Sequence, residues 1–94
     1  MEVIWTKQAI QMLNHFVDYI AHDNYVKAEE WALELMSETD KLIDHPYLGR
    51  IIPEYNEKTL REIIVGNYRI AYRVKDAVYI QAVWHVRQIP PEKE

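Results

Sequence analysis

The stretch LREIIVGNYRIAYRV, residues 60–74, decides the fold of this chain. On both sides of Gly66 and Asn67 it is rich in β-branched and aromatic residues, and apolar side chains alternate with polar ones, which is typical of β-strands. Gly and Asn accept the positive φ angles that a two-residue hairpin turn demands. The stretch therefore predicts an antiparallel hairpin whose strands are residues 60–65 and 68–74.

A third strand is predicted at residues 78–86, after a three-residue turn at residues 75–77. If Val74 stands opposite Val78, residues that oppose each other across the hairpin project to the same face of the sheet. We then expect a core face, covered by helices, that consists of Tyr68, Ile70, Tyr72, Val74, Val78, Ile80, Ala82 and Trp84. The opposite face is expected to remain uncovered, basic and partly apolar, with Leu60, Glu62, Ile64, Arg69, Ala71, Arg73, Tyr79, Gln81, Val83, His85 and Arg87.

The first half of the chain predicts a short strand and two helices. The strand is expected at residues 2–5, and Thr6 is expected to cap a helix over residues 7–21, in which apolar side chains recur at steps of three and four. After a break in this pattern, Asp23 or Asn24 can cap a second amphipathic helix from residue 26 to about residue 44. Its acidic side chains fill the side opposite the apolar stripe.

The predicted order β-α-α-β-β-β indicates an α+β fold in which two N-terminal helices pack on a curved, mainly antiparallel sheet. A chain of 94 residues has material for one core only, so residues 1–94 are expected to form a single domain. A loop should connect the second helix to the sheet over residues 45–59, and residues 90–94 are expected to fray.

Composition narrows the possible functions. The chain has no Cys, which excludes disulfides, thiol nucleophiles and Cys-based zinc sites and favours a cytoplasmic location. No apolar run approaches the ~20 residues that span a membrane. The net charge is −4, yet residues 59–89 carry five Lys or Arg against two Asp or Glu, a local charge of +3. This asymmetry indicates an interaction surface in the sheet region.

Two interpretations of the basic sheet face are open. Arginines beside a histidine could stabilise a phosphate during RNA cleavage, with His85 moving a proton. Alternatively, Arg69 and Arg73 pair with Glu62, with Glu54 or with an acidic partner protein. The remaining histidines are scattered, and no Gly-rich phosphate loop or nucleophile motif is present, so we expect no cofactor and no bound metal.

Four aromatic residues outside the sheet could form a base-stacking set. They come from the predicted helices and from the loop that follows, so core packing and loop anchoring are the preferred interpretation. The four are Tyr19, Trp31, Tyr47 and Tyr55.

In order and spacing, a series of short motifs matches a known family. The motifs are Trp5, the helical segments DYIA (18–21) and AEEW (28–31), PYLGR (46–50), PEY (53–55), the hairpin at 60–74 and VWHVR (83–87). With these motifs the chain resembles the RelE/ParE superfamily of type II toxin-antitoxin toxins, and is most similar to its ParE-like branch. The resemblance implies a prokaryotic toxin that a cognate antitoxin neutralises by wrapping it with a flexible segment.

The resemblance leaves two targets, since RelE-like members cut mRNA on the ribosome and ParE-like members inhibit DNA gyrase. Glu54, Arg69 and His85 fall near the positions of the general base, the phosphate-stabilising arginine and the general acid of some nucleases. Here, however, Val86 occupies the place of the nuclease histidine, and the lysine-rich segment of other nucleases is missing.

The histidine-and-arginine ending is ParE-like, so we expect a gyrase-binding toxin. A ribosome-dependent mRNA endonuclease and a non-toxic antitoxin-binding relative are the alternatives. The residues expected to bind the antitoxin or the target are Arg61, Glu62, Arg69, Arg73, Tyr79, His85 and Arg87.

Overall fold

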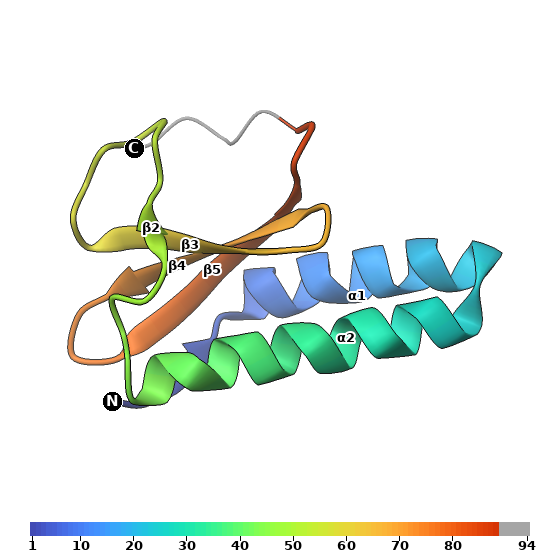
Figure 1. Cartoon of the computed structure of the whole chain (residues 1–94), viewed down its shortest axis with the longest axis horizontal. Helices are drawn as coiled ribbons and strands as arrows, with labels where there is room; N and C mark the ends of the chain where they lie inside the picture. The colour runs from blue at the N-terminus through green and yellow to red at the C-terminus, as the bar shows by residue number, and fades with distance from the viewer. Residues whose placement is uncertain (89–94) are drawn as a thin grey trace.

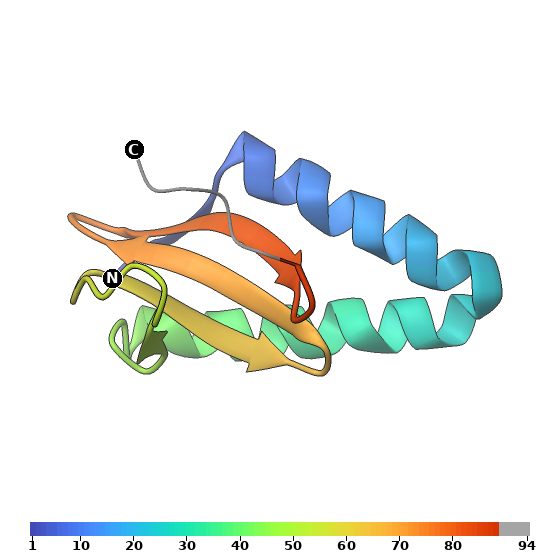
Figure 2. The same cartoon turned by 90° about the horizontal axis from the view of Figure 1, so that it is seen from above.

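The structure is a computed structural model that describes residues 1–88, so the predicted frayed tail at residues 90–94 lies outside the described part. Two helices run antiparallel on one side of a five-stranded sheet (Figures 1 and 2). The elements are, in order, β1 (Val3–Trp5), α1 (Lys7–Asp23), α2 (Tyr25–Asp40), the 3₁₀ turn η1 (Lys41–Ile43), β2 (Arg50–Ile51), β3 (Leu60–Val65), β4 (Tyr68–Val74) and β5 (Val78–His85).

Both helices begin at the predicted caps. The Thr6 hydroxyl accepts a hydrogen bond from the Ala9 N–H at 3.2 Å, and the Asn24 side-chain carbonyl accepts one from the Lys27 N–H at 3.0 Å. Such caps satisfy N–H groups that have no partner inside the helix. The second helix ends earlier than predicted, at Asp40, and continues only as the η1 turn.

The sheet has the order β1-β5-β4-β3-β2, in which β1 runs parallel to β5 and the other neighbours are antiparallel. The predicted β3–β4 hairpin is confirmed: Val65 stands opposite Tyr68, and Gly66 has φ of 61°. Strand β2 was not predicted because two residues are too few to show an alternating pattern. It pairs with β3 and makes residues 50–51 of the 45–59 loop part of the sheet.

The face of the sheet toward the helices carries the main core. Helix α1 lies along β5, and α2 lies against β3. Trp31 and Leu35 are buried among strand side chains as predicted, and Leu13, Phe16, Val17 and Ile20 pack partly buried against them. The strand residues of this core are Val65, Tyr68, Ile70, Tyr72, Val74, Val78, Ile80 and Val83.

A β-bulge in β5 reverses the side-chain order that the sequence predicted. Tyr72 pairs with Ile80, but Ala71 pairs with Ala82, so Gln81 is an extra residue in β5 that has no cross-strand partner in β4. Beyond it Trp84 stands opposite Arg69, and His85 stands opposite Tyr68. The predicted faces of four residues of β5 were therefore wrong. Ala82 and Trp84 lie away from the helices, and Val83 and His85 lie toward them.

The sheet face away from the helices is partly covered, which corrects a second expectation, although Ile64 on this face is 48% exposed. A small apolar cluster lies there beneath residues 52–59, with Tyr55 packed partly buried against it. Its buried members are Ile52, Leu60, Ala71, Ala82 and Trp84. The segment that we expected to be only a connecting loop, here called loop 52–59, therefore forms a second layer over the sheet.

Gly49 fixes the point at which the chain enters this second layer. Its N–H donates a buried hydrogen bond of 2.8 Å to the Tyr72 hydroxyl. A Cβ atom at this position would lie 2.5 Å from the Glu62 carbonyl oxygen, which is closer than real Cβ contacts. Only glycine therefore lets the chain pass so close to β3 before it forms β2.

Candidate functional site

An ion-pair network lies between loop 52–59 and the sheet, and Arg69 is at its centre. The Arg69 Nε donates to Glu62 Oε1 at 2.7 Å, while its Nη1 and Nη2 donate to the two carboxylate oxygens of Glu54 at 3.0 and 2.6 Å. Glu62 Oε2 also accepts from the Arg50 Nε at 2.7 Å. The bidentate contact to Glu54 is the strongest geometry that an arginine and a carboxylate can adopt.

The strands place this network at the boundary between protein and solvent. The Glu62 side chain, on β3, is fully buried, and the Arg69 side chain, on β4, is only 8% exposed. The guanidinium also lies over the Trp84 ring, 5.6 Å from its centroid. Two buried charges are tolerated only where each finds its partner, so Glu62 and Arg69 depend on one another.

The network sets the protonation of Glu54. Its hydrogen bonds from Arg69 lower the pKa of the Glu54 carboxyl from 4.5 to about 2. The same contacts raise the pKa of Arg69 above its ordinary value. A general base for neutral pH needs a pKa near the working pH, so this carboxylate is a weak proton acceptor.

The structure brings together two of the three residues that match the nuclease positions, but not the third. Glu54 and Arg69 are bonded directly, on the face of loop 52–59. His85 packs edge-on against Tyr68, at 5.3 Å between ring centroids, on the helix side of the sheet. Its Nδ1 accepts a hydrogen bond of 3.1 Å from the Arg87 N–H.

The other predicted binding residues around loop 52–59 also have partners within the chain. Arg61 donates to the carbonyl oxygens of Lys58 and Gly49. Arg73 forms a 3.4 Å ion pair with Glu57. Of the two interpretations of this face, the structure supports internal pairing for Arg69 and Arg73, although Arg73 uses a different acid from those expected.

Two further residues of the predicted set lie nearer the ends of β5. The Tyr79 hydroxyl donates to the Asp76 carboxylate at 3.0 Å, and this bond raises the pKa of Tyr79. Arg87 is exposed just after the strand.

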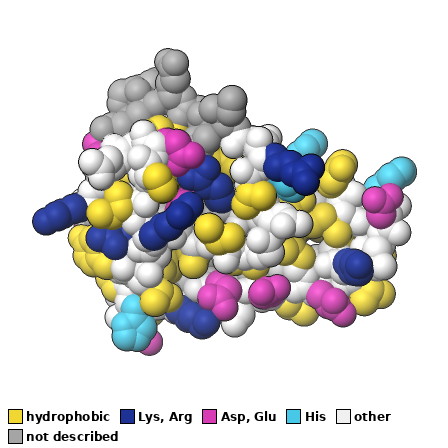
Figure 3. All heavy atoms as spheres, turned by 45° about the horizontal axis from the view of Figure 1, so that its top comes forward, with side chains coloured by type: hydrophobic (Ala, Val, Ile, Leu, Met, Phe, Trp, Pro, Cys, Tyr) yellow, Lys and Arg dark blue, Asp and Glu magenta, His cyan; other side chains and the backbone are white. Residues whose placement is uncertain are grey.

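Figure 3 shows Lys and Arg side chains gathered over the middle of that view, and a row of Asp and Glu side chains along its lower edge.

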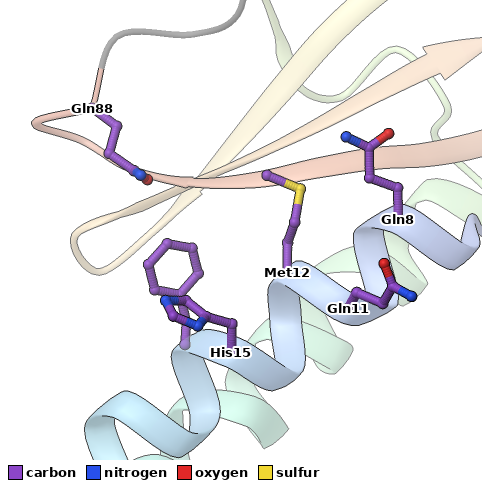
Figure 4. A pocket seen from close by; sticks show the side chains of 6 residues that line it. Gln8, Gln11, Met12, His15 and Gln88 are labelled. Carbon is purple, nitrogen blue, oxygen red and sulfur yellow. The ribbon is translucent and has the colours of Figure 1, made fainter.

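A groove that the sequence analysis missed lies between α1 and the end of β5. It consists of two adjoining hollows of about 280 and 440 Å³, which share His15, Phe16 and Gln88. In Figure 4, Met12 points from α1 toward β5, and Gln88 extends from the segment after the strand. This α1–β5 groove is lined by Gln8, Gln11, Met12, His15, Phe16, Tyr19, Tyr68, His85, Arg87 and Gln88.

Tyr19 shows why the groove was missed. The sequence suggested that Tyr19 packs or anchors a loop, but the residue is 68% exposed and lies at the rim of the groove. The available signal was a stripe of Gln8, Gln11, His15 and Tyr19, which recur at steps of three and four on one face of α1. The bulge in β5, which turns His85 toward this stripe, leaves no sequence signal.

Clusters of metal ligands and membrane-spanning helices are absent from residues 1–88. In this part of the chain, no three His, Cys, Asp or Glu side chains are placed to hold a metal ion. The helices within the same range are too short or too polar to cross a membrane.

Comparison with known proteins gives matches along nearly the whole chain. Residues 3–90 match the family model described as the ParE toxin of the type II toxin-antitoxin system parDE. The protein called Toxin RelE2 of Caulobacter vibrioides is 33% identical over 90 residues, which cover 94% of this chain and 98% of that protein. A solved structure, described as the chromosomal ParDE TA system from P. aeruginosa, matches with a TM-score of 0.73 over 90% of this chain and 95% of that one. At 19% identity this structural match shows the fold.

Proposed function

The chain belongs to the ParE toxin family of type II toxin-antitoxin systems, and from this premise we propose that it acts by binding DNA gyrase and not by cutting mRNA. The names of its relatives do not decide between the two mechanisms, because the family model is ParE and the curated relative is called RelE2. The choice therefore depends on the geometry of the residues that a nuclease would use.

The separation of Arg69 from His85 is the observation that carries the proposal. RNA cleavage by attack of a 2'-hydroxyl needs a base, a cation and an acid around one phosphate. Here the Arg69 guanidinium already donates hydrogen bonds to Glu54 and Glu62, and His85 lies on the opposite side of the sheet. A phosphate could reach Arg69 only by displacing Glu54, and His85 would still be on the other side of β4.

The charge distribution points the same way. The chain carries a net charge of −4, and its acidic groups include Glu29, Glu30, Glu34 and Glu38 along α2. Binding to ribosomal RNA depends on clustered Lys and Arg. Most of the arginines in the sheet region are already bonded to carboxylates or carbonyl oxygens of the chain itself. Protein binding is thus the better-supported mode.

We also propose that a cognate antitoxin neutralises the toxin in the cytoplasm by covering its exposed binding residues. Arg61, Arg73 and Tyr79 are partly exposed, and Arg87 is exposed, so these side chains are available to a partner. Glu62 and Arg69 are buried and contribute by holding loop 52–59 in place.

The test is a pair of assays on the same purified protein. We expect it to inhibit supercoiling by DNA gyrase, or to trap the cleaved complex, and to leave mRNA intact on translating ribosomes. His85→Ala should then reduce gyrase inhibition only modestly, by less than the ~10²-fold that loss of a proton-transfer group causes. Cuts in ribosome-bound mRNA that disappear in His85→Ala or Arg69→Ala, with gyrase unaffected, would establish the nuclease mechanism instead.

A further inference from the structure

The α1–β5 groove ends in a group of hydrogen-bond donors to which no acid of residues 1–88 is bonded. Within residues 1–88, the structure gives no hydrogen-bond partner to the Tyr68 hydroxyl or to the Arg87 guanidinium, although Tyr68 is only 7% exposed. Burial and the nearby Tyr19 raise the pKa of Tyr68, so its hydroxyl keeps its proton. The donor cluster comprises His15, Tyr19, Tyr68, His85 and Arg87.

The turn after β5 fixes the position of this cluster. The His85 N–H donates to the Gln88 side-chain oxygen at 2.7 Å, and the Gln88 N–H donates back to the His85 carbonyl oxygen at 2.9 Å. Because the His85 Nδ1 accepts the Arg87 N–H, the neutral ring carries its proton on Nε2, which leaves that nitrogen as a donor to a ligand. Arg87 is therefore presented on a closed turn beside the imidazole.

The floor of the cluster is aromatic. Phe16 packs edge-on against Tyr68 at 4.9 Å between centroids and against His15 at 5.3 Å. Along the same groove, Met12 adds a flexible apolar side chain, and Gln8 and Gln11 add amides at its rim. A large apolar side chain fits such a floor, while the amides can bond to peptide backbone.

The charges around the groove favour an acidic ligand. Helix α1 carries two acids, Asp18 and Asp23, whereas α2 carries five. Arg87 and the two histidines line the groove itself, and among the described residues of the lining there is no acid. Complementary charge steers encounter and selects partners.

From these observations we propose that the donor cluster binds a carboxylate of an acidic peptide segment, while a neighbouring large apolar side chain of that segment packs on Phe16 and Met12. The inference rests on the proposed function for the source of the segment, which is the antitoxin. It places an antitoxin contact in the α1–β5 groove, in addition to any contact near loop 52–59. The same donors could bind a free phosphate ion, so the test includes inorganic phosphate.

The experiment is a titration of the full chain followed by nuclear magnetic resonance. The probes are the capped pentapeptide Glu-Leu-Phe-Glu-Glu, the matched peptide with Gln in place of each Glu, and inorganic phosphate. We expect the acidic peptide to bind more tightly than either of the other probes. Its chemical-shift changes should be concentrated on the donor cluster and on Phe16.

Matched variants identify the groups responsible. Arg87→Ala and Tyr68→Phe should each weaken binding of the acidic peptide by roughly tenfold, because each removes one hydrogen bond to a charged group. Lys75→Ala, which removes one positive charge at the β4–β5 turn, should change it less than twofold. The proposal would be overturned if the Gln peptide bound as tightly as the acidic peptide, or if phosphate did so at the same residues. It would also be overturned if the chemical-shift changes lay elsewhere, or if Arg87→Ala and Lys75→Ala had equal effects. None of these outcomes depends on the gyrase assay, so the two proposals fail separately.

Discussion

The face of the sheet under α1 and α2 is closed by apolar side chains, whereas the other face is closed by loop 52–59 through an ion-pair network over a small apolar cluster. Burial of apolar area is non-directional and tolerates many arrangements. The network is directional: Arg69 meets each of its partners through specific nitrogens. The comparison shows that an arginine on a basic sheet face can serve the fold by bonding to carboxylates of its own chain.

The largest expected effect compares a tryptophan from each face. Trp31→Ala and Trp84→Ala should each lower the free energy of unfolding by ~3–5 kcal/mol, as buried large-to-small changes, measured by chemical denaturation. Hydrogen exchange should separate them: Trp31→Ala should expose amides of α1 and α2, and Trp84→Ala should expose amides of loop 52–59. If Trp84→Ala loosened the helices and not the loop, Trp84 would face the helices, as the sequence alone predicted.

A smaller expected effect is a pH dependence of the free energy of unfolding. It arises on the network face, which is the sheet face that carries the Arg69 ion pairs and loop 52–59. The folded state lowers the Glu54 pKa from 4.5 to about 2, so ionised Glu54 stabilises the fold above pH 4.5 and loses this contribution as pH falls toward 2. Unfolding curves should show the parent chain more stable than Glu54→Gln near neutral pH, with the difference shrinking between pH 4.5 and 2.

Glu38→Gln is the matched control for that measurement, because Glu38 forms an exposed ion pair with Lys41 on the solvated side of α2. Exposed pairs of this type contribute little to stability. A Glu54→Gln curve that ran parallel to the parent curve over the whole pH range would show that Glu54 is not bonded to Arg69 in solution.

The helix face could be predicted from sequence because its signals are periodic. Caps at Thr6 and Asn24, the stripes of α1 and α2, and the turn at Gly66 each follow a local rule, and the structure confirms them. The network face could not be predicted in this way. Its main determinant is the bulge at Gln81, where apolar residues on both sides of the strand hide the change of face.

The candidate site also has one part that the sequence could predict and one part that it could not. The pairing of Glu54 and Arg69 was among the sequence interpretations, because both charges are visible in the sequence. The groove was not, because it joins one side of α1 to the turn after β5, and only the fold brings His15 and Phe16 to His85. Contacts between such distant segments depend on register, which one bulge changes.

A double-mutant cycle of Glu62 and Arg69 tests directly the claim that Arg69 is held by carboxylates of its own chain. Glu62→Gln and Arg69→Met should each cost up to about 3–5 kcal/mol of unfolding free energy, because each removes one partner of a buried charge and leaves only the other, Glu54 for Arg69 or Arg50 for Glu62. Arg50→Ala, on a side chain that is 56% exposed, should cost about 1 kcal/mol or less as the control. We predict that the double variant is more stable than the sum of the single effects by about 2 kcal/mol. Additivity within about 0.5 kcal/mol would contradict the claim and leave Arg69 free for a ligand.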